Sequence, residues 1–109
     1  MTVTITDDNF GTEVLESEVP VMLDCWATWC GPCLMIAPAI EQISEEYKGR
    51  VKVGKLDVDE NQIVSMQLGI RSIPTLLIFK NGEIVDGMIG AGQKKRMTDM
   101  LDKVLGVVA

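Results

Sequence analysis

The sequence contains no histidine among its 109 residues and only three cysteines. Histidine is the usual general base, a common ligand of zinc and the side chain that most often changes charge near neutral pH. Any proton transfer by this chain must therefore use carboxylates, lysine, thiols or water. Three cysteines are too few, and odd in number, for the disulfide framework of a small secreted domain. We therefore expect a reducing, cytoplasmic environment.

Long apolar runs and basic charge are also lacking. No apolar run approaches the roughly 20 residues that a membrane-spanning helix needs, and residues 1–8 show neither the basic nor the apolar part of a signal peptide. The net charge of −6 argues against binding to nucleic acid or to anionic membranes. The apolar share of 47% and the charged share of 24% are typical of a globular protein. The length predicts a single domain over residues 1–109.

What the sequence does contain is an alternation of strand-like and helix-like segments. The run 19–27 predicts a buried strand, because its apolar residues follow one another without alternating. Asn81-Gly82, between two strand-like runs, predicts a tight hairpin. Strands separated by helices pair in parallel, and the closing hairpin makes the expected α/β sheet mixed. The expected strands are 3–6, 19–27, 51–59, 75–79 and 83–89, and the expected helices are about 9–17, 32–47, 60–68 and 93–107.

The motif Trp-Cys-Gly-Pro-Cys at 29–33 lies between the buried strand and the second expected helix. At this spacing Cys30 and Cys33 share one helix face with β-carbons roughly 5–6 Å apart. A disulfide needs about 3.5–4.5 Å, so a modest adjustment lets the bond form and open. A cross-link over so short a loop restrains the unfolded chain little, which makes it a poor structural staple. The spacing therefore favours redox cycling.

The two thiols are not equivalent. Cys30 takes the cap position of the helix, where the positive end of the helix dipole stabilises a thiolate. We therefore expect Cys30 to be the exposed nucleophile and Cys33 the covered resolving thiol. The alternatives are a pair of inert buried cysteines or half of a metal site, but a four-ligand zinc site would need two more ligands and only Cys25 remains. We expect Cys25 to be a buried packing residue rather than a regulatory thiol.

Asp24 is a charged residue inside an otherwise apolar strand. Such a residue is rarely buried without a partner. One interpretation is a solvated strand end, or a carboxylate that simply pairs with Lys55. The other is a carboxyl of raised pKa that takes a proton from Cys33. Lys55 is then either a modulator of Asp24 or a plain surface lysine.

Residues typical of one protein family occur along the whole chain, in the order in which they occur in that family. They are Asp24, Trp26, the WCGPC run at 29–33, Pro38, Lys55, the GIRSIPT run at 69–75, the KNGE run at 80–83 and Gly90-Ala91-Gly92. On these residues the chain resembles the thioredoxin family over essentially its whole length. The resemblance implies a thioredoxin fold of the α/β class, with a five-stranded sheet in the order 1-3-2-4-5 flanked by four helices. It also implies a dithiol–disulfide oxidoreductase that reduces disulfides in target proteins.

The resemblance implies roles for individual residues as well. Cys30 would form a mixed disulfide with the target, and Cys33 would resolve it. Asp24 would accept the proton of Cys33 through water, and Lys55 would modulate Asp24. Although a trans bond is the ordinary state before a proline that begins a strand, Pro74 would be a cis-proline that faces the dithiol. The active-site loop would comprise Trp29, Gly31 and Pro32, and the substrate groove Val58, Ile73, Pro74, Ile89, Gly90 and Ala91.

No cofactor-binding motif is present, so we expect no bound cofactor other than the reversible Cys30–Cys33 disulfide, and no metal. The expected partners are disulfide-containing target proteins and thioredoxin reductase, which would regenerate the dithiol. We expect the protein to be a monomer. Gly31-Pro32 offers no histidine to stabilise a thiolate, which favours a reductase over an oxidase or isomerase. The alternative to an enzyme is a binding module whose dithiol takes part in no redox reaction. The clearest departure from the family is Leu34, where many relatives carry lysine.

Overall fold

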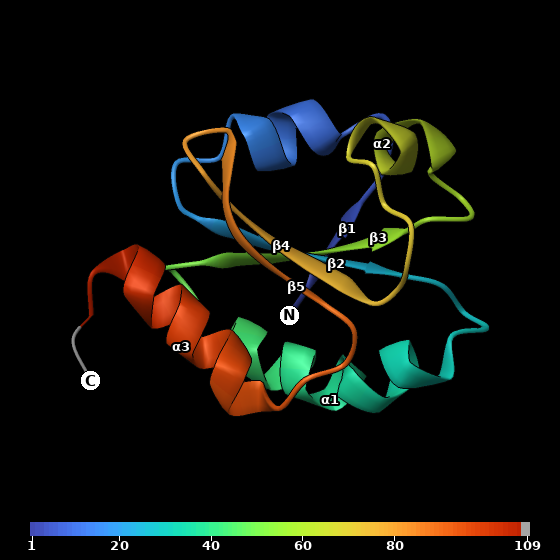
Figure 1. The fold of residues 1–109 in the computed structure, drawn as a ribbon. Helices are drawn as coiled ribbons and strands as arrows, with labels where there is room; N and C mark the ends of the chain where they lie inside the picture. Colours follow the sequence, from blue (N-terminus) through green and yellow to red (C-terminus); the bar gives the residue numbers. More distant parts are fainter. Residues whose placement is uncertain (108–109) are drawn as a thin grey trace.

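A computed structural model describes residues 1–107. The strands are β1 (Val3–Ile5), β2 (Val21–Trp26), β3 (Lys52–Asp57), β4 (Thr75–Lys80) and β5 (Glu83–Ile89). The helices are η1 (Gly11–Leu15), which is a π-helix, α1 (Gly31–Glu46), α2 (Gln62–Gln67) and α3 (Lys94–Leu105). The five strands form one mixed sheet in the order β1-β3-β2-β4-β5, with η1 and α2 on one face and α1 and α3 on the other (Figure 1). The expected strand order and element order are confirmed.

Strand β2 forms the centre of the sheet, parallel to β3 and antiparallel to β4. Its residues 21–25 are buried, as the continuous apolar run predicted. Successive side chains point to opposite faces. Met22 packs with Ile36 and Ile40 of α1, whereas Cys25 belongs to the core on the side of η1 and α2. Asp24, two residues after Met22, therefore lies on the face that α1 covers.

Several elements are shorter than expected, among them β3 and the first helix. The third strand ends at Asp57 because its carboxylate Oδ1 accepts the backbone N–H of Asp59 at 2.9 Å, which turns the chain. The first helix spans only Gly11–Leu15, and Glu16 donates its N–H to the carbonyl of Gly11 in the wide π-type register. Glycine and the β-branched residues Thr12 and Val14 are poor formers of a regular α-helix, which accounts for the difference.

The hairpin between β4 and β5 turns through Asn81 and Gly82, with φ angles of 53° and 78°. Two successive positive φ angles define the type I′ turn that the Asn-Gly pair predicted. Glycine is required at the second position for another reason as well. A β-carbon on Gly82 would lie 2.9 Å from the carbonyl oxygen of Leu15, so the turn fits closely against the end of η1.

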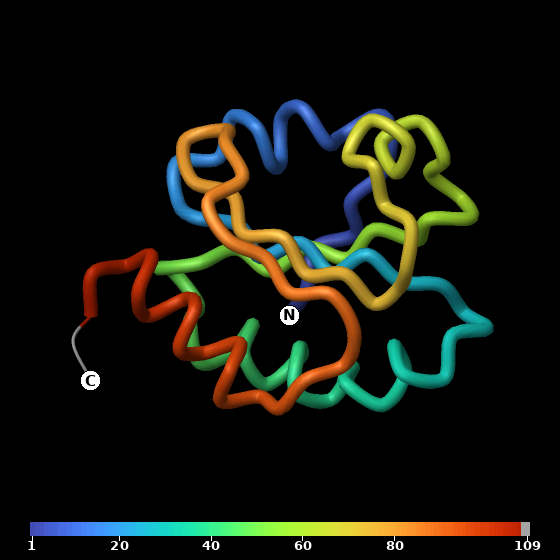
Figure 2. The backbone as a smooth tube through the Cα atoms, viewed as in Figure 1, coloured from blue at the N-terminus to red at the C-terminus, as the bar shows by residue number. Residues whose placement is uncertain are grey.

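Three connecting segments meet at one end of the sheet. Figure 2 shows the loop before α1, the segment 70–74 before β4 and the segment 89–92 after β5 at this end. Residues far apart in the sequence are thereby brought to the N-terminus of α1. Within the part of the chain that the structure describes, no helix is both long and apolar enough to cross a membrane.

Candidate active site

The dithiol lies at the N-terminus of α1 and is closed as a Cys30–Cys33 disulfide, with 5.2 Å between the two Cα atoms. Cys30 is the N-cap residue, with an extended backbone, and its sulfur accepts the backbone N–H of Cys33 at 3.2 Å. Pro32 fits the first turn of the helix because that turn does not need its N–H. The sulfur of Cys30 thus stands where the free N–H groups of the helix would stabilise negative charge.

Both cysteines are covered in this oxidised form. Cys30 is 4% exposed and Cys33 is 2% exposed. The expectation of an exposed Cys30 is therefore wrong for the disulfide state, because the bond directs its sulfur toward Cys33 and into an apolar cluster. The residues in that cluster or packed against it are Ala27, Cys30, Cys33, Trp26, Val58 and Ile73. Position at the helix cap, rather than exposure, is what distinguishes the two sulfurs here.

Asp24 is completely buried, and neither carboxylate oxygen has a hydrogen-bond partner in residues 1–107. Loss of hydration disfavours the ionised form, so burial raises the pKa of Asp24 from 3.8 to about 6, against a smaller lowering by the charge of Lys55. The interpretation of Asp24 as a solvated strand end is wrong. The carboxyl therefore keeps its proton to a higher pH than an exposed aspartate does, on the face of the sheet that α1 covers.

Lys55 faces Asp24 across the β2–β3 pair, and its Nζ lies 4.0 Å from Asp24 Oδ2. The same ammonium lies 4.5 Å from the centre of the Trp26 ring, a cation–π contact. A surface pocket lined in part by Trp26, Lys55 and Asp57 reaches this lysine from outside. Lys55 therefore separates the buried carboxyl from solvent and is more than a plain surface lysine.

Substitution of Lys55 by glutamine is expected to raise the pKa of Asp24 further above about 6, because the charge of Lys55 lowers it. The measurement is a carboxyl-carbon NMR titration of Asp24 between pH 4 and 9. Lys52→Gln is the matched control, since Lys52 lies on the same strand and pairs instead with Glu13 at 2.9 Å. A pKa of Asp24 that is unchanged or lower in Lys55→Gln, or equally raised in Lys52→Gln, would contradict this assignment.

Beside the dithiol, the peptide bond between Ile73 and Pro74 is cis, as the resemblance implied. The carbonyl of Pro74 accepts the N–H of Gly90 at 2.8 Å, and Thr75 pairs with Ile89. These contacts join the start of β4 to the end of β5. Val58 and Ile73 pack against the cysteines, Gly90 adjoins Pro74, and Ile89 and Ala91 are exposed next to it. The structure thus brings together the expected groove residues from three separate segments.

Trp29 is 68% exposed, and its indole nitrogen donates to Asp59 Oδ2 at 2.7 Å. Asp59 was not expected at the site, because sequence analysis placed it at the end of a strand. The hydrogen bond spans 30 residues, so no local pattern could have revealed it. It holds the tryptophan that directly precedes Cys30.

The remaining candidates lie as follows. Cys25 is buried on the opposite face from Asp24, and burial raises the pKa of its thiol to about 12, with a smaller contribution from the charge of Asp24. This favours the packing role. Leu34 is half exposed on the rim of the dithiol. No group of three or more histidine, cysteine or acidic side chains in the described chain is arranged to hold a metal ion.

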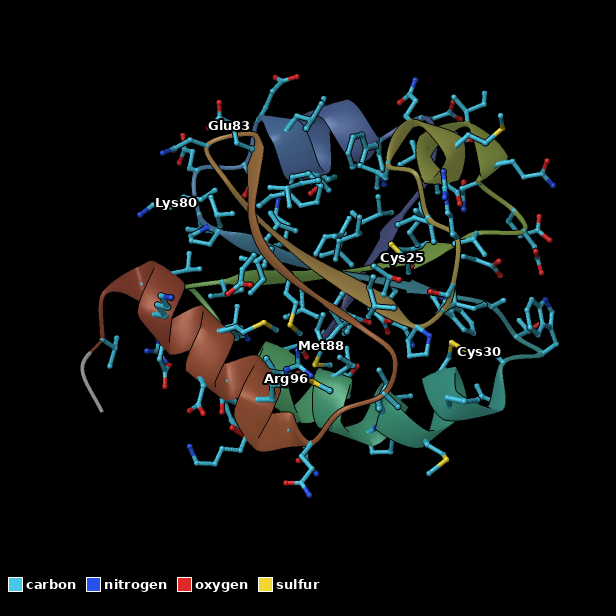
Figure 3. The ribbon with its side chains drawn as sticks, viewed as in Figure 1. Cys25, Cys30, Lys80, Glu83, Met88 and Arg96 are labelled. Atoms are coloured by element: carbon cyan, nitrogen blue, oxygen red, sulfur yellow. A yellow bond between two sulfur atoms is a disulfide. The ribbon has the colours of Figure 1, made fainter. Side chains whose placement is uncertain are left out.

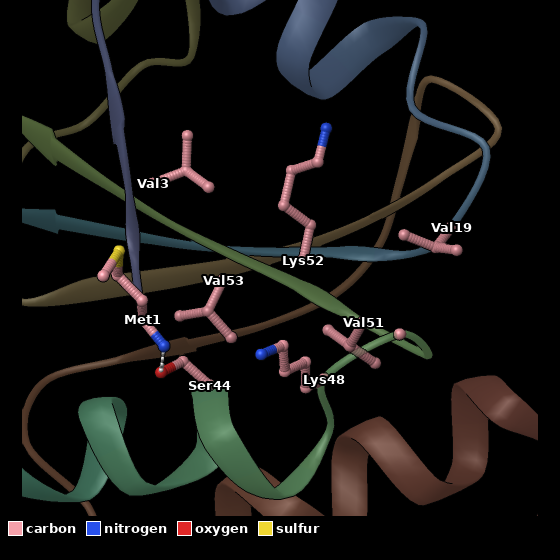
Figure 4. A pocket seen from close by; sticks show the side chains of 9 residues that line it. Met1, Val3, Val19, Ser44, Lys48, Val51, Lys52 and Val53 are labelled. Carbon is pink, nitrogen blue, oxygen red and sulfur yellow. Dashed lines mark hydrogen bonds between the residues drawn. The ribbon is translucent and has the colours of Figure 1, made fainter.

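A further pocket lies at the other end of α1 (Figure 4). Met1, Ser44, Lys48 and Val53 are among its lining residues, and the Met1 amine donates to Ser44 Oγ at 3.0 Å. Ser44 is thirteen positions after Gly31 in α1, and at 1.5 Å per residue the pocket is roughly 20 Å from the dithiol. It is separate from the redox site.

Two thiols that close into a disulfide at a helix N-terminus, beside exposed apolar residues such as Trp29 and Ile89, can exchange disulfides with other molecules. Fold and site together define an α/β protein of the dithiol–disulfide oxidoreductase class.

Comparison with known proteins identifies the family. The family described as Thioredoxin matches residues 1–103. Thioredoxin 1 of a Nostoc species is 52% identical over 101 residues, which is 93% of this chain and 94% of the relative. The thioredoxin of Rickettsia felis is 52% identical over 91% of this chain and 94% of its own length, and that of a Synechocystis species is 52% identical over 93% and 94%. The chain belongs to the thioredoxin family and is a protein-disulfide reductase that acts by dithiol–disulfide exchange.

Proposed function

We propose that the two cysteines act in a fixed order. The Cys30 thiolate attacks one sulfur of a protein disulfide, forms a mixed disulfide and releases the other sulfur as a thiolate. The Cys33 thiolate then attacks Cys30 Sγ, which closes the Cys30–Cys33 bond and releases the second target thiol. Two electrons pass to the target, and the dithiol becomes a disulfide. The observation that carries this order is the N-cap position of Cys30, which favours its thiolate.

Asp24 is the proton acceptor for Cys33 in this proposal, acting through water. Its placement under α1 and its pKa of about 6 support the role, because a carboxyl of that pKa is mainly ionised at neutral pH and still binds a proton readily. Lys55 modulates Asp24 by holding a positive charge 4.0 Å from its oxygen.

Extended target segments bind beside the dithiol. In residues 1–107 no partner is found for the backbone N–H or C=O of Ile73, so both groups are open to an added strand. The apolar surface for the target side chains comprises Trp29, Val58, Ile73, Pro74, Ile89, Gly90 and Ala91.

The remaining partners follow from the chemistry. The chain offers no dinucleotide-binding glycine motif, so electrons must come from another protein, and we propose thioredoxin reductase. We also propose that residues 1–109 act as one domain and as a monomer in the cytoplasm, where reduced thiols are the normal state.

The test is the reduction of insulin disulfides by dithiothreitol, followed as turbidity. The protein is expected to shorten the lag in proportion to its concentration, and a thioredoxin reductase with its electron donor is expected to replace dithiothreitol. NADPH-linked and ferredoxin-linked reductases are tested separately. A lag equal to that with dithiothreitol alone would overturn the proposal and favour a binding module. A reduction potential close to that of an isomerase would instead make the protein an oxidant.

A further inference from the structure

A second recess opens next to the dithiol, along the end of β5. The strands β4 and β5 contribute its floor, the segment before β4 forms one wall, and α3 supplies one side chain. Its lining residues are Leu68, Gly69, Ile70, Arg71, Ser72, Thr75, Leu77, Gly87, Met88, Ile89 and Arg96. Here we call it the arginine groove. It is continuous with the redox site, because Ser72 precedes the cis Ile73–Pro74 bond and Ile89 belongs to both surfaces.

The floor of the arginine groove is apolar, and no side chain fills it at Gly87. Gly87 pairs with Leu77 across the β4–β5 ladder. A β-carbon on Gly87 would lie 3.3 Å from Leu77 Cδ2 and 3.1 Å from the Leu76 carbonyl oxygen, so glycine leaves the floor open at this point. Ile89 is 73% exposed at the end nearest the dithiol. An apolar side chain of a bound segment can therefore contact Leu77 and Ile89.

The charged residues that line the groove have one sign. Arg71 and Arg96 are its charged lining residues, and no aspartate or glutamate lines it. Both arginines are exposed, and neither forms an ion pair with any residue in 1–107. Figure 3 shows Arg96 beside Met88, between α3 and β5, and both side chains approach Gly92. In a chain of net charge −6, this leaves a local positive surface without an internal partner.

We propose that the arginine groove binds the segment that flanks the reactive cystine of a target protein, and that it selects segments carrying aspartate or glutamate next to an apolar residue. The inference rests on the proposed function, since the target disulfide must lie at Cys30. Guanidinium groups bind carboxylates through paired hydrogen bonds. Charges on the rim of an interface act mainly on the association rate and its salt dependence. Arg71 and Arg96 are therefore specificity-determining residues rather than catalytic residues.

The experiment uses three synthetic peptides that share one disulfide and differ only in a flanking Glu-Leu-Glu, Gln-Leu-Gln or Lys-Leu-Lys. We measure the second-order rate constant with which the pre-reduced protein reduces each peptide, in 10 mM and 150 mM salt, so that the Cys30–Cys33 dithiol is the electron donor. The proteins are the wild type, the double variant Arg71→Gln with Arg96→Gln, and the conservative double variant with lysine at both positions. The matched control is Lys80→Gln with Lys103→Gln, which removes the same charge from a different recess; Figure 3 shows Lys80 far from Cys30. A neutral small disulfide, bis(2-hydroxyethyl) disulfide, monitors the redox chemistry.

The wild type is expected to prefer the acidic peptide over the neutral one by about two- to fivefold at low salt. The preference should shrink at 150 mM salt, where the Debye length is about 8 Å. It should disappear in the double glutamine variant, persist in part in the double lysine variant and remain in the control. Equal rates for all three peptides, or an equal loss of preference in the control variant, would overturn the proposed role of the arginine groove in selecting acidic segments. Failure to reduce even the small neutral disulfide would instead overturn the proposed function.

Discussion

Cys30→Ser is expected to lower the rate of protein-disulfide reduction by at least about a thousandfold, because the attacking thiolate is lost. Cys33→Ser should lose turnover to a similar extent, since the mixed disulfide can no longer be resolved from within the protein. The two variants should differ in what they accumulate. Cys33→Ser should retain target proteins in mixed disulfides on Cys30, and Cys30→Ser should retain few. The measurement is non-reducing electrophoresis after incubation with insulin whose disulfides are intact.

Cys25→Ser is the control for this pair of variants. Cys25 is buried on the far face of the sheet, so its loss should leave reductase turnover close to that of the wild type. Thermal unfolding of each variant shows whether the fold is intact. If Cys30→Ser retained the targets and Cys33→Ser did not, the assignment of nucleophile and resolving thiol would be reversed.

Asp24→Asn is expected to stabilise the protein by about 3 kcal/mol at neutral pH. The carboxyl is fully buried, and burial raises its pKa from 3.8 to about 6. Below pH 3.8 the group is protonated in the folded and the unfolded chain and carries no penalty. As the pH rises toward about 6, the unfolded chain ionises first, so folding loses free energy. Above that pH the penalty is constant, at about 1.4 kcal/mol for each pH unit between the two pKa values.

Asparagine does not titrate, so the gain should be absent near pH 3.5, grow with pH and level off above about 6. The rise in Tm at pH 7 should be on the order of 10 °C for a domain of this size. Asp8→Asn removes the same charge from an exposed position and is the matched control. The more stable Asp24→Asn should also turn over more slowly where Cys33 must lose its proton. Urea unfolding curves that show no gain at any pH above 5 would contradict the raised pKa.

Most of the fold follows from local patterns in the sequence. The apolar run around Met22 identified the central strand, Asn81-Gly82 identified the hairpin, and the alternation of elements identified the mixed sheet. The strand order came from the family resemblance, since alternation alone does not fix which strands are neighbours. Element ends were less well predicted, because they depend on single hydrogen bonds such as the one that ends β3 at Asp57.

The redox site was predictable to a similar degree. The spacing of Cys30 and Cys33 and the charge of Asp24 in an apolar strand were visible in the sequence, and the burial of Asp24 agrees with the interpretation of a raised pKa. The family resemblance placed Val58 and Ile73 beside the dithiol, but sequence analysis expected an exposed Cys30 and missed how completely the apolar cluster covers it in the disulfide form. The Trp29–Asp59 hydrogen bond and the placement of Arg71 and Arg96 around one groove were missed because they join segments that are distant in the sequence. Contacts between distant segments require the three-dimensional arrangement.

The burial of Cys25 gives the molecule a built-in probe of its own unfolding. In the oxidised protein Cys30 and Cys33 are bonded to each other, so Cys25 is the single free thiol of the chain. Its side chain is fully buried in the central strand, and its raised pKa keeps it protonated. A thiol reagent can reach it only when the sheet opens. The rate at which one equivalent of reagent is consumed under native conditions therefore reports the frequency of opening of the core, without any engineered label.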